Sequence, residues 1–150
     1  RRAHTTYART IIVRSGFIFG PGGKNFLSAI VQKVEENEPI KAISDSFGTP
    51  TFVLDLAQRL RELAELDLPG VFHIANAGDG ASYEEFARTV VQATGQNAVI
   101  QPVTDASLQR PARRPANSRL KCLYSEALGL SPLRPWREAL AHFIEIERVS

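Results

Sequence analysis

The sequence is poor in cysteine and sulfur and has no long apolar run: its 150 residues include one cysteine, Cys122, and no methionine. One cysteine cannot form an intramolecular disulfide or a multi-cysteine zinc site, and it fits a cytoplasmic location, which we expect. No apolar run approaches the roughly 18 residues of a membrane-spanning helix, so we expect no membrane partner. The charge is nearly balanced, at +2, and gives no indication of a nucleic-acid partner.

The composition is that of one globular domain. Hydrophobic residues make up 43% of the chain, which excludes intrinsic disorder, and the 10 glycines and 9 prolines follow no period, which excludes collagen-like structure. The histidines, His4, His73 and His142, stand far apart and lack the spacing of metal ligands. We therefore expect no metal site, and a structural role for His73 within a strand.

Hydrophobic periodicity predicts strands alternating with helices. Apolar residues at helical spacing between Phe26 and Val34 are typical of an amphipathic helix, Thr51 is a plausible N-cap, and Ser82 with Glu85 forms a capping-box pattern. The expected strands are 11–13, 40–43, 71–75 and 99–100, the expected helices are 25–36, 52–66, 83–94, 120–128 and 135–147, and the expected loops include 45–50 and 101–119. This alternation predicts an α/β fold.

Two of these strands predict a sheet larger than the chain can build. Ile11–Val13 and 71–75 are apolar enough to be wholly buried in a parallel sheet. Parallel strands covered on both faces need neighbouring strands, and few candidates remain. We therefore expect that sheet to be built mostly by sequence outside these residues, in a longer protein.

The glycine-rich stretch 16–23 comes between a strand and a helix, where phosphate-binding loops occur. A P-loop would need glycine in place of Ile18 and serine or threonine in place of Asn25, so that motif fails. The dinucleotide motif Gly-x-Gly-x-x-Gly is also missing. Two interpretations stay open: a structural turn, or a ligand edge lined by backbone.

Charged residues suggest one further candidate site. Capping and turn chemistry account for Asp45, Asp55 and Asp79, so none of them is assigned a catalytic role. The basic residues concentrate in one proline-stiffened segment, where guanidinium groups could bind phosphate oxygens or simply be solvated. They are Arg110, Arg113, Arg114, Arg119 and Lys121.

Several strings, in order along nearly the whole chain, resemble the dTDP-4-dehydrorhamnose reductases, a family of extended short-chain dehydrogenases/reductases. They are Val13 to Gly20 with Gly23 to Phe26, Asp45 to Thr51 with Asp55 to Ala57, Gly70 to Ile74, Ala112 to Leu120, and Pro135 to Leu140. The resemblance implies the last strands and helices of a Rossmann sheet plus a small substrate-binding subdomain. Residues 1–150 would then form the sugar-nucleotide-binding domain.

The resemblance also implies that the catalytic residues lie outside this chain. The family's glycine-rich cofactor loop and its Tyr-x-x-x-Lys motif belong to the N-terminal half. Tyr7 does not match that tyrosine, because Ile11 stands where the lysine is required. The chain alone is therefore expected to be inactive, with NADP or NAD held mainly by the other half.

The site residues implied by the resemblance number seven. Ser15 and Gly16 would lie beside the cofactor. Phe17, Lys24, Asn25, Arg113 and Arg114 would bind the substrate. The sequence departs from the family pattern where Phe17 replaces a tryptophan, Ser15-Gly16 a Thr-Ser pair, and Ser46 a glutamine, which leaves the exact sugar open. Trp136 is expected to pack in the core.

The implied activity is reduction of dTDP-4-dehydro-6-deoxy-L-mannose to dTDP-L-rhamnose, with a nucleotide sugar as substrate. The alternatives are an epimerase or reductase of another nucleotide sugar, a non-catalytic subunit like the regulatory subunit of methionine adenosyltransferase, and a free-standing binding module. A homodimer is left open.

Overall fold

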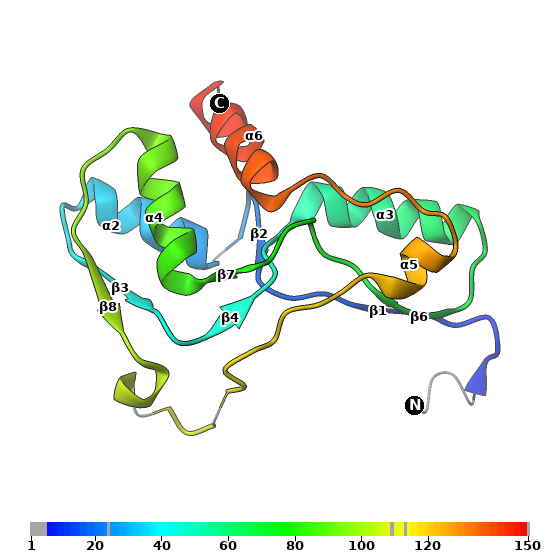
Figure 1. The fold of residues 1–150 in the computed structure, drawn as a ribbon. Helices are drawn as coiled ribbons and strands as arrows, with labels where there is room; N and C mark the ends of the chain where they lie inside the picture. Colours follow the sequence, from blue (N-terminus) through cyan, green and yellow to red (C-terminus); the bar gives the residue numbers. More distant parts are fainter. Residues whose placement is uncertain (1–5, 24, 109, 113, 150) are drawn as a thin grey trace.

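The computed structural model describes residues 6–23, 25–108, 110–112 and 114–149 (Figure 1). The strands are β1 (Ile11–Arg14), β2 (Ile18–Phe19), β3 (Ile40–Ile43), β4 (Phe47–Gly48), β5 (Thr51–Phe52), β6 (Gly70–His73), β7 (Ala81–Ser82) and β8 (Ile100–Val103). The helices are α2 (Phe26–Glu35), α3 (Val53–Glu65), α4 (Tyr83–Thr94), the 3₁₀ helix η1 (Asp105–Leu108), α5 (Leu123–Ala127) and α6 (Trp136–Val149).

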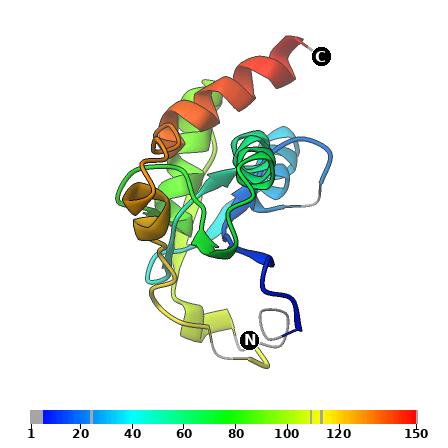
Figure 2. The same ribbon diagram turned by 90° about the vertical axis from the view of Figure 1, so that its right-hand side faces the viewer.

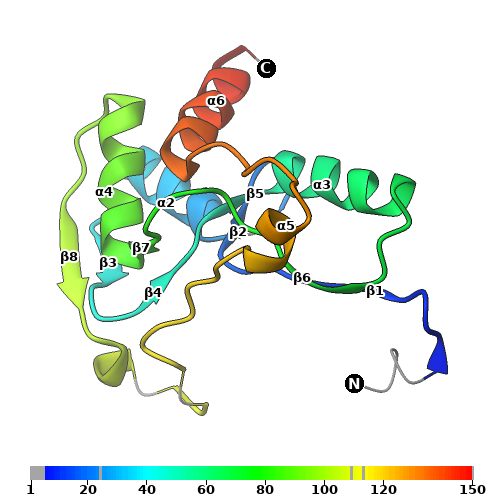
Figure 3. The ribbon, with the colours of Figure 1, turned by 45° about the vertical axis from the view of Figure 1, so that its right-hand side comes forward.

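The strands pair two by two among the described residues. The pairs β1–β6, β2–β5 and β3–β8 are parallel, and β4–β7 is antiparallel. The pair β3–β8 packs with α2 and α4 on one side of the molecule, and β1–β6 packs with α3 and α5 on the other (Figures 1 and 3). The last helix, α6, packs against α4 (Figure 2). The short pairs β2–β5 and β4–β7 lie between the two sides.

The α/β alternation is confirmed, but β1 is not wholly buried as expected. Ile11, Ile12 and Val13 are half-buried and Arg14 is exposed. In the described part of the chain β1 is paired with β6 alone and contacts α3. One paired edge and one covering helix cannot remove these side chains fully from water.

Both predicted loops contain regular structure. The stretch 45–50 includes β4, and 101–119 begins with the rest of β8, which extends to Val103, and with η1. Pro102 lies within β8, which is compatible with a strand at a sheet edge. These short strands depend on partners far away in sequence, which a local pattern does not contain.

The helix ends confirm one predicted cap, at Ser82, correct another, at Thr51, and add one at Asn25 that was not predicted. Asn25 caps α2, accepting hydrogen bonds from the N–H groups of Leu27 and Ser28, and Ser82 caps α4 by accepting from Glu85 N–H. Thr51 does not cap α3: the residue at the cap is Phe52, with no side-chain bond. The last two helices begin at Leu123 and at Trp136, somewhat later than predicted.

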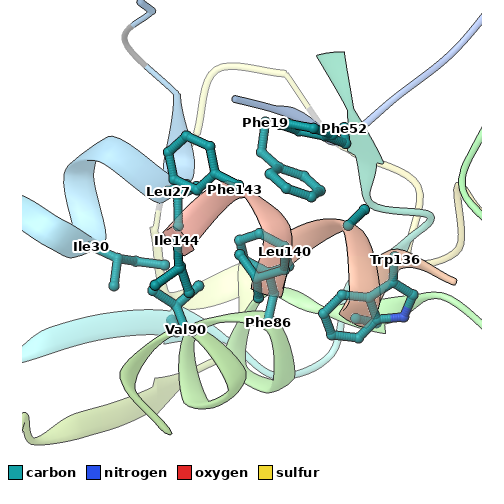
Figure 4. Close-up of a cluster of buried hydrophobic side chains, with 14 of the residues drawn as sticks. Phe19, Leu27, Ile30, Phe52, Phe86, Val90, Trp136, Leu140, Phe143 and Ile144 are labelled. Carbon is teal, nitrogen blue, oxygen red and sulfur yellow. The ribbon is translucent and has the colours of Figure 1, made fainter. Parts of the chain in front are cut away.

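The main core lies where α2, α4 and α6 meet β2 and β5 (Figure 4). Its largest fully buried side chains are Phe19, Phe52 and Phe86, and Phe19 stacks on Phe52 with ring centroids 5.5 Å apart. Trp136, 3% exposed, belongs to this core, which confirms its predicted packing role.

A second, smaller core lies beneath α3. Its buried members are Leu56, Leu63, Phe72 and Ile74.

In the described residues no helix is long and apolar enough to cross a membrane.

Candidate functional site

The predicted cofactor residues directly follow the carboxyl end of β1. The Ser15 hydroxyl oxygen is buried and has no hydrogen-bond partner within the described part of the chain. Gly16 is open: a Cβ added there would meet nothing within 4 Å, apart from its chain neighbours. Its carbonyl oxygen accepts a hydrogen bond from the Thr51 hydroxyl at 3.0 Å. The Ser15 hydroxyl is therefore a buried polar group whose partner is not found among the described residues, and the open position is at Gly16.

Phe17 lies at a turn of the backbone, and its ring packs in an aromatic cluster. Its φ is +48°, a left-handed conformation that non-glycine residues rarely adopt. The half-buried ring stacks on Tyr83 with centroids 4.5 Å apart, and it lies 4.9 Å from Phe86 and 6.1 Å from Phe26. The ring is therefore fixed in place by packing, while part of it remains accessible.

Part of the basic segment, residues 116–118, lies close to Phe17, next to Gly48. The N–H of Phe47 donates to Ala116 O (2.9 Å), and Ser118 N–H donates to Phe47 O (2.8 Å), so residues 116–118 run alongside β4. A Cβ added at Gly48 would lie 3.2 Å from Phe17 Cδ1 and 3.5 Å from Ser118 Oγ. Glycine here lets the aromatic ring and the basic segment approach each other.

The described cations of this segment differ in the contacts that they make. Arg110 forms an ion pair with Asp105 (3.3 Å). Arg119 donates to Asp79 O and Asn117 Oδ1, both at 3.1 Å, and its guanidinium lies 5.3 Å from the centre of the Phe47 ring. Arg114, by contrast, is exposed and makes no ion pair with another described residue. Lys121, the remaining described cation of this segment, is also exposed and makes no ion pair with another described residue.

Asn25 is largely engaged inside the protein. Its side-chain oxygen caps α2, and its Nδ2 donates to Gly20 O at 3.1 Å and to Gly23 O at 3.3 Å. What remains for an anion is the helix N-terminus itself, which favours negative charge. The other two predicted substrate residues, Lys24 and Arg113, lie outside the described residues.

A cavity of about 440 Å³ borders the glycine-rich stretch, with Gly20, Gly22 and Gly23 on one wall and Leu27 and Phe143 among the others. This agrees with the interpretation of that stretch as a ligand edge lined by backbone. A cavity of about 330 Å³ lies beside Phe47 and Arg119. Neither cavity is lined by Phe17 or Arg114.

A buried polar cluster was missed from the sequence. Asp55, 9% exposed, was attributed to capping and turn chemistry, but it accepts hydrogen bonds from Arg134 and from Asn76 Nδ2 (2.7 Å). Asn76 in turn accepts from Phe52 N–H at 2.7 Å. An aspartate on the buried face of an amphipathic helix was the available signal, since a buried carboxylate needs a partner.

Among the described residues, Cys122 and the potential metal ligands remain to be considered. Burial raises the pKa of the Cys122 thiol, so the group carries less thiolate at a given pH than an ordinary cysteine. In the part of the chain that is described, no three His, Cys, Asp or Glu residues come together as a metal site would require.

Residues 2–149 match the model of a protein family described as the RmlD substrate binding domain. The chain belongs to this family. The chain is 35% identical over 135 residues to a dTDP-4-dehydrorhamnose reductase of Streptomyces griseus, covering 86% of this chain and 44% of that protein. It is 33% identical over 134 residues to the spore coat polysaccharide biosynthesis protein SpsK of Bacillus subtilis, covering 89% and 46%.

Solved structures agree with the RmlD-type fold. A crystal structure of dTDP-4-dehydrorhamnose reductase from Bacillus anthracis in complex with NADP superimposes with a TM-score of 0.86 at 29% identity, covering 91% of this chain and 48% of that one. The predicted fold class, the C-terminal portion of an extended short-chain dehydrogenase/reductase, is therefore confirmed. The chain spans less than half the length of these relatives.

Proposed function

We propose that residues 1–150 are the sugar-nucleotide-binding domain of an NAD(P)-dependent dTDP-4-dehydrorhamnose reductase, which converts dTDP-4-dehydro-6-deoxy-L-mannose to dTDP-L-rhamnose in the cytoplasm. The observation that carries the proposal is the match to such a reductase along 86% of this chain. The Rossmann half with the catalytic tyrosine and lysine is supplied by further sequence. The half-buried strand β1, paired with β6 alone among the described residues, is consistent with such a partner.

In this proposal the substrate lies across the carboxyl end of β1. Phe17 packs against the sugar, the N-terminus of α2 with Lys24 and Asn25 faces phosphate oxygens, and Arg113 and Arg114 bind them with charge-assisted hydrogen bonds. The accessible part of the Phe17 ring and the exposed Arg114 side chain support these roles. Gly48 allows the two segments to meet.

NADP or NAD, when bound, supplies the hydride. This chain would border the cofactor through Ser15, whose buried hydroxyl lacks a partner among the described residues, and through Gly16, whose open side leaves room for a planar ring. A hydroxyl there can donate or accept a hydrogen bond and so orient a carboxamide or a sugar oxygen. The proton for the reduced carbonyl comes from the other half of the enzyme.

The proposal is tested first by sequencing the coding DNA upstream of Arg1. A glycine-rich cofactor motif followed by Tyr-x-x-x-Lys is the expected result, and the encoded full protein should oxidise NADPH or NADH when given dTDP-4-dehydro-6-deoxy-L-mannose. A start codon immediately before Arg1, or an upstream half without that tyrosine and lysine, contradicts the reductase and leaves a binding subunit. Faster turnover of another nucleotide sugar corrects the substrate alone.

A further inference from the structure

Thr51 is the most completely buried polar residue beside the loop 15–17. It is 0% exposed, and its side chain and backbone both reach that loop. The hydroxyl lies 3.0 Å from Gly16 O and 3.2 Å from Thr49 O, and the backbone N–H donates to Phe17 O at 3.0 Å. No ligand can touch a side chain so deeply enclosed, so any effect of Thr51 on binding must pass through its neighbours.

The loop needs such support because Phe17 has an unfavourable backbone conformation. A φ of +48° brings the Cβ of an L-residue close to its own backbone, and such residues persist only where the surroundings determine them. Thr51 accounts for two consecutive carbonyl groups at this turn, those of Gly16 and Phe17. Loss of either bond would remove part of what holds the turn.

The strand that carries Thr51 is itself anchored. Thr51 pairs with Ile18 in the β2–β5 ladder, and the next residue, Phe52, donates its N–H to Asn76 Oδ1 at 2.7 Å. Asn76 is 2% exposed and bound to Asp55. Thr51 therefore connects the buried Asp55–Asn76 cluster, through β5, to the Gly16–Phe17 turn at the candidate site.

We propose that Thr51 is a positioning residue for the sugar pocket: its hydroxyl holds the Gly16–Phe17 turn so that the Phe17 ring faces the sugar. The part that concerns the sugar rests on the proposed function. The alternative is a purely local role, in which the hydroxyl serves Thr49 O within its own turn. Because one hydroxyl has one proton, the two roles compete, and they predict different behaviour on removal of the hydroxyl.

The test compares Thr51→Val, which keeps the shape and loses the hydroxyl, with Thr51→Ser, which keeps the hydroxyl. Two measurements are made on the full protein that the gene encodes and on each variant of it. The first is the set of carbonyl and Cα chemical shifts of Gly16 and Phe17, which report a left-handed residue without any ligand. The second is calorimetric titration with dTDP-L-rhamnose and, separately, with dTDP, which lacks the sugar.

We expect Thr51→Val to lose the left-handed signature at Phe17 and to bind dTDP-L-rhamnose about tenfold more weakly, as expected for one lost buried hydrogen bond. Affinity for dTDP should stay within about twofold, and Thr51→Ser should restore both properties, because only the hydroxyl is needed. An unchanged signature in Thr51→Val, or an equal loss of affinity for both ligands, overturns the proposal.

Failure of the proposed function gives a different pattern. If the unaltered full protein binds neither dTDP-L-rhamnose nor dTDP, the ligand assignment is wrong, and the chemical shifts alone decide the role of Thr51. A signature lost in Thr51→Val and kept in Thr51→Ser then still supports the positioning role, whereas a signature kept in both contradicts it.

Discussion

Arg134 forms a two-pronged ion pair with Asp55: its Nε and Nη2 donate to the two carboxylate oxygens at 2.9 and 2.8 Å. The two residues are 79 positions apart in the sequence. The ion pair therefore holds the segment before α6 against the first turn of α3. The Arg134 guanidinium also lies 5.5 Å from the centre of the Phe52 ring, above a residue of the main core. The pair therefore connects the two sides of the molecule.

Replacing Arg134 with alanine should lower the free energy of unfolding by about 2–3 kcal/mol, because Asp55 is left buried without its cation. The value lies below that of a fully buried pair, since the Arg134 side chain is 32% exposed. Urea denaturation followed by circular dichroism measures it. Arg61→Ala, which removes an exposed pair with Glu65, is the matched control and should cost less than about 0.5 kcal/mol. Equal effects of the two substitutions would contradict a structural role for the Asp55 pair.

Gly80 should tolerate no side chain. Its φ is +80°, and an added Cβ would lie 2.5 Å from Gly48 O and 2.7 Å from Arg119 Cδ. We expect Gly80→Ala to reduce the free energy of unfolding by about 2–4 kcal/mol, combining left-handed strain with a backbone clash. Gly95→Ala separates these causes, because Gly95 has a φ of +70° and open space around it. Gly95→Ala should lower the free energy of unfolding by about 1 kcal/mol. Thermal melts in which both variants lose the same stability would exclude the clash.

The sequence predicted the elements with strong local signals. The periodicity from Phe26 to Val34 and the cap at Ser82 depend on neighbours within one or two turns, and both were found. The strands β4 and β5 are two residues long and exist through partners such as Ser82 and Ile18. No local pattern contains such pairings.

The candidate site was predictable to a similar extent. The family resemblance implied that Phe17 and Arg114 belong to one site, which stays a prediction, and the structure places Phe17 and Ser118 of the basic segment beside Gly48. The supporting residues were missed, because the role of Asp55 depends on Asn76 and Arg134, and the role of Thr51 on a carbonyl 35 residues away. Burial and long-range hydrogen bonding decide these roles, and both become visible only in the folded chain.

Cys122 should react slowly with alkylating reagents. Burial is the main cause that raises its pKa, and the nearby Glu126 raises it further, while a backbone hydrogen bond with Ala75 and the charge of Arg59 act in the opposite direction. A raised pKa means less thiolate at a given pH, so alkylation by iodoacetamide at pH 8 should be several-fold slower in the folded chain than in urea. The folded rate should also keep rising with pH beyond the range in which an ordinary thiol levels off. Mass spectrometry of timed samples measures both, and equal rates with and without urea would contradict the effect of burial.

The double substitution Arg113→Ala/Arg114→Ala should weaken binding of dTDP-L-rhamnose by at least about tenfold in the intact enzyme, since each charge-assisted hydrogen bond contributes about 1.5–3 kcal/mol. The affinity for dTDP should fall as well, because the arginines bind the phosphates and not the sugar. Arg61→Ala/Arg88→Ala removes the same charge from exposed helical ion pairs and controls for the general field of the protein. Calorimetric titration at two salt concentrations distinguishes direct contacts from that field, which salt screens. Unchanged affinity would make the segment a solvated loop, and the phosphates would then depend on the N-terminus of α2 and on residues outside this chain.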